Sequence, residues 1–219
     1  MVAQAFLEDG KRVLLSVALG ARESYGSWNS FLTDMKERGL NDPLLIITDG
    51  SPGLLRALSE VFPDVDTQRC TKHKMANVLE KVLKADQKEI KDDLRSIFYA
   101  PTLEHAKEAI TLFERKWRKR FPSAVECLLK DIDSCLTYYK FPYIHWRRIR
   151  TINAIERGFR EVRQRVRGIG RFKDEERALA FVYRQMKENE CRWKGLSMTE
   201  EAKDILRLLK SIRMERLAA

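Results

Sequence analysis

The chain has 219 residues, of which 44% are hydrophobic and 34% are charged. This mixture can bury a sizeable core and excludes the low-hydrophobicity composition of disordered chains. No run approaches the roughly 18 apolar residues of a membrane span, and the four cysteines are widely spaced with no secretory signal. We therefore expect a globular, soluble, cytoplasmic protein with reduced thiols, not a membrane protein or a disulfide scaffold.

Positive charge is concentrated in one stretch of the chain. The formal net charge is +10, and residues 144–173 alone hold ten basic and two acidic side chains. Arginine dominates this stretch, and its planar fork of donors suits phosphate, so a polyanionic partner is the first interpretation. The alternative is a solvated helix face.

The first residues predict a strand hairpin followed by a helix. Two runs rich in Val and Leu, 2–7 and 13–19, flank Glu8-Asp9-Gly10, which is typical of a turn. Apolar residues at helical spacing then predict a helix from about Ser24 to Arg38, which Gly39 ends.

A second strand-and-helix unit follows. The unbroken apolar run 44–48 predicts a central strand that is buried on both faces. Ser51 as N-cap and Pro52 in the first turn begin a helix that reaches about Val61. A short strand at 65–69 and a helix at 71–83 complete the first part of an α/β core, residues 1–85.

Residues 86–143 show helical periodicity only, which indicates an inserted all-helical domain. Ser123 with Glu126 predicts a capping box at the start of its third helix. Its apolar stripes are Ile90, Leu94, Ile97 and Phe98; Ala106, Ile110, Phe113 and Trp117; and Val125, Leu128, Leu129, Ile132 and Leu136.

Residues 144–219 are expected to return to the core. A helix is predicted at 151–167, where Gly168 and Gly170 break it. Two amphipathic helices, about 174–190 and 197–214, finish the chain.

Two acidic residues are candidates for metal chemistry. Asp49 follows the apolar strand, and open α/β sheets present ligand-binding groups at this end of a strand. Its carboxylate is a hard oxygen ligand of the kind that divalent ions prefer, although Asp-Gly also makes an ordinary turn. Glu156 lies inside the arginine-rich helix. It suits a metal ligand beside a phosphate-binding surface, or an ion pair with Arg160 one turn later.

Two further features have more than one interpretation. Cys70 and His73 have the spacing of half a zinc site, but no second closely spaced pair exists, which favours a packing or positioning role. Trp146 is flanked by His145 and by Arg147 and Arg148. It is a candidate for contact with DNA bases, or a buried anchor.

In their order and spacing, these residues resemble the Mutator-type family of bacterial insertion-sequence transposases along nearly the whole chain. The matching elements are Glu8-Asp9-Gly10, Ser24–Trp28, Phe31-Leu32, Lys36–Leu40, Ile47–Gly50 with Gly53, Ala57–Phe62, Gln68–Cys70, His73, Asn77, Arg150–Arg157 and Phe159–Arg163.

The resemblance implies an α/β fold of the ribonuclease-H-like type, whose Asp-Asp-Glu triad binds two Mg²⁺ or Mn²⁺ ions. Asp49 matches the second Asp and Glu156 the Glu, and both would be catalytic metal ligands. Cys70 and His73 match a Cys-x-x-His signature, and Asn153 belongs to the motif around Glu156. The resemblance further implies a homo-oligomer that acts on transposon ends and target DNA. The residues expected to bind DNA are Arg147, Arg148, Arg150, Arg157, Arg160, Arg163, Arg167 and Trp146.

The family's first Asp ends a strand upstream of the hairpin that begins here. We therefore expect a core that is incomplete at its N-terminus, with the helical insertion and C-terminal helices intact, and a truncated transposase of impaired activity. The alternatives are a non-catalytic DNA-binding or regulatory fragment that co-assembles with full-length transposase, and a helical interaction protein without a nucleic-acid partner.

Overall fold

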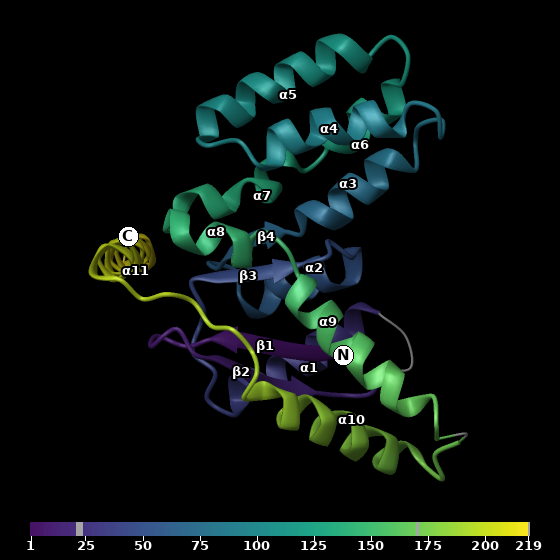
Figure 1. Ribbon diagram of the computed structural model, residues 1–219. Helices are drawn as coiled ribbons and strands as arrows, with labels where there is room; N and C mark the ends of the chain where they lie inside the picture. Colours follow the sequence, from purple (N-terminus) through teal and green to yellow (C-terminus); the bar gives the residue numbers. More distant parts are fainter. Residues whose placement is uncertain (21–23, 170, 219) are drawn as a thin grey trace. The chain divides into compact units, whose positions relative to one another are not determined.

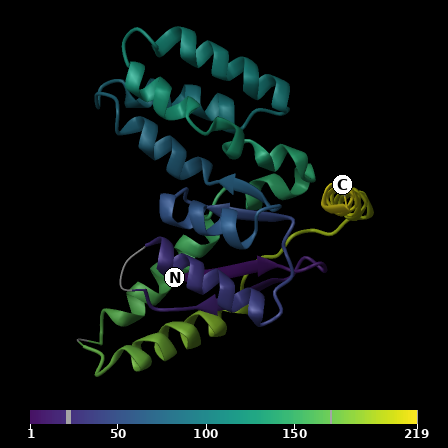
Figure 2. The same ribbon diagram turned by 180° about the vertical axis from the view of Figure 1, so that it is seen from behind.

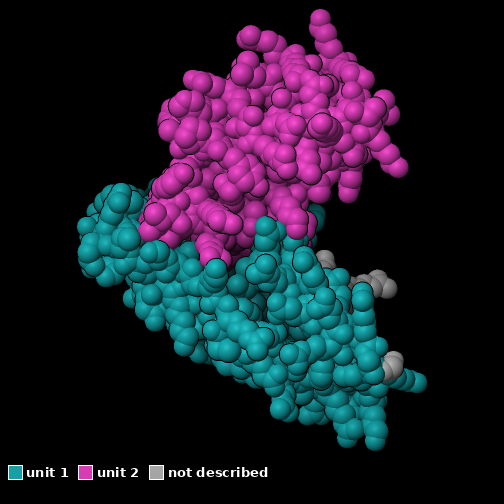
Figure 3. Space-filling model, in the orientation of Figure 1, with its two compact units in different colours: residues 1–44, 50–65, 152–219 teal, residues 45–49, 66–151 magenta. Residues whose placement is uncertain are grey.

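The computed structural model describes residues 1–20, 24–169 and 171–218. They form two compact units, which Figure 3 shows in two colours: unit 1 holds residues 1–44, 50–65 and 152–219, and unit 2 holds residues 45–49 and 66–151. Strands lie only in the first third of the described chain, and helices follow (Figure 1). The expected mixed α/β class is therefore confirmed. No helix in the described ranges is long and apolar enough to cross a membrane.

Unit 1 combines a hairpin with five helices among its described residues. Its elements are β1 (Val2–Phe6), β2 (Arg12–Val17), α1 (Tyr25–Glu37), α2 (Pro52–Val61), α9 (Asn153–Val166), α10 (Glu175–Glu190) and α11 (Glu200–Ala218).

The predicted hairpin is confirmed. Strands β1 and β2 pair antiparallel, from Val2 opposite Val17 to Phe6 opposite Arg12. Gly10 closes the turn at φ +83°, in the left-handed region that favours glycine. Its carbonyl accepts from the backbone N–H of Leu196 at 2.8 Å, and a Cβ at Gly10 would collide with the Leu196 carbonyl. The turn therefore needs glycine for its space as well as its φ.

Helices α1 and α2 lie side by side in both views (Figures 1 and 2). The Ser24 side chain caps α1 by accepting from the backbone N–H of Ser27. Pro52 starts α2 as predicted, while the Ser51 hydroxyl makes no capping bond to it. The buried side chains of the two helices are Phe31, Leu32 and Met35 on α1 and Ala57 and Leu58 on α2.

Helices α9 and α10 pack with the hairpin through one apolar cluster. Its buried members are Leu14 of β2, Val162 of α9 and Met186 of α10. Partly buried side chains that complete it are Val2, Val17, Phe159, Val166, Val182 and Trp193. Helix α9 thus buries one narrow stripe. It ends at Val166, before Gly168 as predicted, whereas Gly170 lies outside the described residues.

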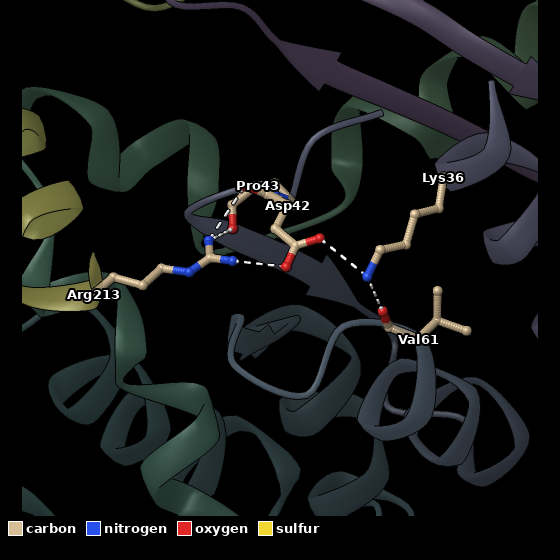
Figure 4. Close-up of polar contacts among 5 residues, drawn as sticks. All are labelled: Lys36, Asp42, Pro43, Val61 and Arg213. Atoms are coloured by element: carbon tan, nitrogen blue, oxygen red, sulfur yellow. Dashed lines mark hydrogen bonds and ion pairs between the residues drawn. The ribbon is translucent and has the colours of Figure 1, made fainter. Parts of the chain in front are cut away.

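Helix α11 is held to the rest of unit 1 by polar contacts (Figure 4). The Arg213 guanidinium donates to the carbonyl of Pro43 at 2.7 Å and pairs with the Asp42 carboxylate at 3.0 Å. Asp42 also pairs with Lys36 at 3.4 Å, and Lys36 donates to the Val61 carbonyl at 2.8 Å. One carboxylate therefore links α1, the segment before β3, and α11.

Unit 2 joins a two-stranded parallel sheet to a group of helices. Its elements are β3 (Leu45–Thr48), β4 (Asp66–Arg69), α3 (Thr71–Leu79), α4 (Gln87–Phe98), α5 (Leu103–Trp117), α6 (Pro122–Leu129), α7 (Ile132–Cys135), the 3-10 turns η1 (Thr137–Lys140) and η2 (Tyr143–His145), and α8 (Trp146–Ile149).

Strand β3 departs from its prediction. It pairs with β4 from Leu45 opposite Asp66 to Thr48 opposite Arg69, and among the described residues this is its one strand neighbour. Leu45, Ile46 and Ile47 are half-buried and only Thr48 is buried. The expectation of a central strand buried on both faces is therefore wrong for this structure. A central position needs a strand at each edge, and burial of both faces needs a packed layer over each of them.

The helices of unit 2 differ from the prediction at their ends. Pro122 takes the first helical position of α6, so Phe121 becomes the N-cap and Ser123 falls inside the first turn. The predicted capping box is therefore wrong. The third apolar stripe is also split, because the chain leaves the helix after Leu129 and re-enters it at Ile132.

A buried amide ties β4 to the helices of unit 2. Gln68 is fully buried; its Nε2 donates to the carbonyl of Cys135 and its Oε1 accepts from the backbone N–H of Tyr138, both at 2.8 Å. Buried polar groups are costly unless they are hydrogen-bonded, so this pair of bonds fixes β4 against the segment that follows α7.

A buried ion cluster ties α3 to the loop between α6 and α7. The Lys74 side chain is only 1% exposed, and its ammonium pairs with Asp131 and donates to the carbonyl of Cys127. Arg69 pairs with the same carboxylate. Burial lowers the pKa of Lys74 below its ordinary value.

We predict that Asp131→Ala destabilises the protein strongly. It leaves the buried Lys74 ammonium without its counter-charge, which costs about 3 kcal/mol or more. Glu114→Ala is the control, because Glu114 pairs with Arg118 at the surface, where such pairs contribute roughly 0–1 kcal/mol. Urea unfolding of both variants measures the difference. Equal losses in the two variants would contradict a structural role for the buried cluster.

We also predict that Cys135 makes stability depend on alkaline pH. Burial raises the pKa of this thiol to about 12 from its ordinary 9.0. The unfolded chain therefore loses the thiol proton first, and the stability that the neutral thiol contributes is present below pH 9.0 and lost as pH rises through about 12. We compare the free energies of unfolding of the parent protein and Cys135→Ala, measured in urea. Between about pH 8 and 10.5, the amount by which the parent protein is more stable should shrink by about 2 kcal/mol.

The control for this experiment is Cys191→Ala, because Cys191 is exposed. Its unfolding free energy should stay parallel to that of the parent protein over the same pH range. If the gap between Cys135→Ala and the parent protein is also constant with pH, the buried thiol does not titrate as described.

Candidate functional site

Asp49 directly follows β3, at the carboxyl end of the strand. It belongs to unit 2 and is half-buried. Gly50 follows with φ +86°, a backbone conformation that favours glycine. No turn is assigned at Asp49-Gly50, so the ordinary-turn interpretation stays untested. Its place after β3 puts Asp49 where strands of open α/β sheets present ligand-binding groups.

Backbone hydrogen bonds gather several chain segments beside this strand end. Within unit 2, the N–H of Cys70 donates to the carbonyl of Thr48 at 2.7 Å. The N–H of Thr71 donates to the carbonyl of Arg150 at 3.0 Å, and the Thr71 hydroxyl reaches the same carbonyl at 3.2 Å. The residue before Asp49, the start of α3 and the segment that leads to α9 are therefore connected.

The Cys-x-x-His pair lies at the start of α3. Cys70 is fully buried at its N-cap position and His73 is half-buried in its first turn. The backbone bond from Cys70 to Thr48 and the complete burial of its side chain give this cysteine a packing role, one of the two interpretations that the spacing favoured.

Glu156 lies in the first turn of α9, in unit 1, and is half-buried. Asn153, the first residue of the helix, is exposed. Arg160, Arg163 and Arg167 follow Glu156 at intervals of four, seven and eleven residues, which places all four side chains along one side of a helix. Asp49 and Glu156 are thus carried by different compact units.

The arginines of this stripe are not paired with any acid among the described residues. Arg160, Arg163 and Arg167 are exposed, as is Arg157, and none of them forms an ion pair within the described part of the chain. The alternative interpretation of Glu156 as the ion-pair partner of Arg160 is therefore wrong.

Several exposed arginines elsewhere in the described chain do have acidic partners. The pairs are Arg38 with Asp34, Arg56 with Glu60, Arg95 with Asp92, Arg118 with Glu114, Arg120 with Asp86, Arg177 with Asp174, Arg184 with Glu188, and Arg207 with Asp204. Arg115 on α5 and Arg216 on α11 are exposed without an ion pair among the described residues, so open charge is not confined to α9. What distinguishes α9 is that its exposed arginines follow one another along a single side of the helix.

The basic residues just before α9 fall into two groups. Arg147 and Arg148 on α8 are exposed, and neither forms an ion pair among the described residues. Arg150 is half-buried; its guanidinium stacks over the ring of Tyr99 at 4.0 Å and donates to the carbonyl of Phe98 at 3.5 Å. Arg150 therefore packs within unit 2, and its expected DNA contact competes with these interactions.

Trp146 is an anchor within unit 2. Its indole N–H donates to the carbonyl of Phe141 at 2.8 Å, and its ring packs edge-on against those of Tyr138, Tyr139 and Tyr143. The indole N–H of Trp146 thus already has an acceptor within the protein, which agrees with the anchor interpretation. A contact of Trp146 with DNA stays a prediction.

Tyr143 is a feature that the sequence interpretation missed. Its side chain is 72% exposed, although it packs on Trp146 and precedes the exposed Arg147 and Arg148. An aromatic residue beside a basic run was the available signal, but periodicity cannot show which of Tyr143 and Trp146 faces solvent.

Comparison with known proteins gives a consistent family assignment. The model of the family "Transposase, Mutator family" matches residues 1–195. The transposase for insertion sequence element IST2 of Acidithiobacillus ferrooxidans is 38% identical over 94% of this chain, and that for IS6120 of Mycolicibacterium smegmatis is 35% identical over 86%. The transposase for ISRM5 of Rhizobium meliloti is 30% identical over 84% of the chain.

The chain spans 69%, 58% and 46% of the length of these three relatives, respectively. The family match includes the strand end at Asp49, the Cys70 and His73 pair, and the whole of α9 with its arginine stripe. This protein therefore belongs to the Mutator family of transposases.

Proposed function

We propose that this chain takes part in the cutting and joining of DNA at the ends of an insertion sequence, with Asp49 and Glu156 as metal ligands of a ribonuclease-H-like core. The observation that carries the proposal is one side of α9, where a carboxylate is followed by three exposed arginines that form no ion pair with any described acid. Phosphate oxygens are the chemistry that such a surface recognises. Membership of a transposase family supports DNA as the molecule that supplies these phosphates.

Glu156 follows closely, along the chain, a segment that is hydrogen-bonded to the start of α3 in unit 2. Arg150 is hydrogen-bonded to Thr71, beside the strand end that precedes Asp49, and Glu156 follows six residues later. Six residues span at most about 20 Å, and fewer when the last of them are helical. This short connection supports the proposal that the two residues act together.

The donor chemistry of the two residues fits a divalent ion. Carboxylate oxygens are the ligands that Mg²⁺ and Mn²⁺ take, and both side chains are half-buried. Among residues 1–20, 24–169 and 171–218, no three His, Cys, Asp or Glu side chains form a group, so the fit rests on Asp49 and Glu156. When bound, divalent ions supply Lewis-acid charge to the phosphate that reacts.

The arginine stripe has a separate role in this proposal. At 1.5 Å rise per residue, Arg160, Arg163 and Arg167 lie about 6, 10 and 16 Å beyond Glu156 along the helix axis. Side chains at these intervals bind successive backbone phosphates that lead away from the reacting one, and so set the register of the DNA. Their contribution is binding and orientation, while the carboxylates contribute the chemistry.

A second candidate uses the same surface without the chemistry. A chain that binds DNA through α9 and assembles with further transposase subunits needs the arginines but not Asp49. Assembly into a homo-oligomer is part of both proposals. The two candidates differ in what happens when the carboxylates are replaced, because only the first loses a reaction.

We predict that Asp49→Asn and Glu156→Gln abolish DNA nicking and strand transfer while DNA affinity changes less than about twofold. Each change removes one metal ligand and keeps the size of the side chain. The assay uses DNA with the ends of the element and either Mg²⁺ or Mn²⁺, and Glu161→Gln, on the same helix, is the control. If both variants react as the parent protein does, the two carboxylates are not catalytic. A parent protein that binds DNA without any product favours the second candidate.

We predict that replacing Arg160, Arg163 and Arg167 together by Ala weakens DNA binding and its dependence on salt. Each lost phosphate contact lowers the slope of log K against log salt by about 0.9, so three should lower it by about 2 to 3. Fluorescence anisotropy between about 50 and 200 mM salt measures the slope.

The matched control replaces Arg38, Arg118 and Arg184 by Ala. It removes the same formal charge from exposed arginines that are paired with acids. The slope of log K against log salt for this control should differ from that of the parent protein by less than about 0.9, the change expected for one phosphate contact. Equal slopes for the two triple variants would show that net charge, and not the α9 stripe, binds the DNA.

A further inference from the structure

At the junction of η2 and α8 in unit 2, an exposed aromatic ring precedes two exposed arginines that form no ion pair among the described residues. The Tyr143 side chain is 72% exposed, and its ring lies edge-on to that of Trp146 at 4.8 Å. The next exposed side chains along the chain are Ile144, Arg147 and Arg148. A single exposed tyrosine is common on protein surfaces, so it is the combination of this ring with the two arginines beside it that indicates a partner.

The ring is held in place by rigid neighbours. Pro142 is buried before it, and the carbonyl of Pro142 accepts from the backbone N–H of His145, which closes a tight turn around Tyr143. Trp146 behind it is fixed by its hydrogen bond to the Phe141 carbonyl and by the rings of Tyr138 and Tyr139. A ring fixed in this way loses little conformational entropy when a ligand stacks on it.

The charge of the surroundings indicates the kind of ligand. Arg147 and Arg148 form no ion pair in the described ranges, and residues 139–150 contain no acid. A protein partner would have to bring its own carboxylates, whereas a nucleic acid offers phosphates for the arginines and a flat base for the ring. Duplex DNA keeps its bases stacked inside, so a base that reaches Tyr143 must be unpaired.

We propose that Tyr143, backed by Trp146, stacks on an unpaired base of DNA while Arg147 and Arg148 bind the flanking phosphates. This inference rests on the proposed DNA-binding function and adds a site for a single-stranded or frayed end. The site lies outside α9 and does not involve Asp49 or Glu156. Stacking is tolerant of base identity, because every base has an aromatic face.

The test compares the affinity of the full chain for two labelled DNAs, a blunt duplex and the same duplex with a short unpaired overhang. The parent protein should bind the overhang DNA more tightly. Tyr143→Ala should bind the overhang DNA with an affinity lower by roughly tenfold or more, and its affinity for the blunt duplex should change little. Tyr143→Phe keeps the ring and should bind both DNAs as the parent protein does. In addition, the fluorescence of 2-aminopurine placed in the overhang should be quenched by the parent protein and by Tyr143→Phe, but not by Tyr143→Ala.

Tyr183→Ala is the matched control, since Tyr183 is another exposed tyrosine, on α10 of unit 1. It should leave the preference for the overhang unchanged. If Tyr143→Ala keeps that preference, or alters subunit assembly alone, the stacking site is wrong although DNA binding stands. A parent protein that binds neither DNA would overturn the proposed function as well.

Discussion

The one-sided packing of α9 is the constraint on which the candidate interface depends. Val162, with Phe159 and Val166, packs in the cluster formed with Leu14 and Met186. Burying these side chains stabilises the helix in one rotational setting, since any other setting would expose them and bury arginines without partners. The orientation of Glu156 and of the arginines that follow it is thus a consequence of apolar packing on the opposite side of the same helix.

In unit 2, a second set of constraints is polar. The carbonyl of Arg150 accepts from Thr71, and the carbonyl of Thr48 accepts from Cys70, so the strand ends and the segment entering α9 share one hydrogen-bonded region. Gln68 and the Lys74–Asp131 pair attach this region to the helices around it. Gln68 and Lys74 each have polar partners, which offsets the cost of burying them beside the strand that leads to Asp49.

Local signals in the sequence predicted most of the elements. The Val- and Leu-rich runs on either side of Glu8-Asp9-Gly10 predicted the hairpin, and Ser24 and Pro52 marked helix starts. The stripe from Glu156 to Arg167 could also be predicted, because helical spacing alone defines it.

Long-range pairs could not be predicted in the same way. Lys74 and Asp131 are 57 residues apart, and no periodicity links them. The number of strand neighbours of β3 is likewise absent from its own residues, which explains why the apolar run at Leu45–Ile47 suggested more burial than the structure has. At Trp146 and Tyr143, the choice of which ring faces solvent is made by tertiary packing against Tyr138 and Tyr139. The assignment of a ligand role to Asp49 and Glu156 came from the resemblance and not from spacing.

The central claim is that Asp49 and Glu156 bind the same divalent ion. Its most direct test replaces Mg²⁺ by Fe²⁺ in the DNA-bound protein and adds ascorbate and peroxide, so that radicals formed at the ion cleave the nearest backbone. Mass spectrometry of the fragments should show cuts next to both residue 49 and residue 156, suppressed together by excess Mg²⁺. Cuts at one of these positions without the other, or at neither, would contradict the account.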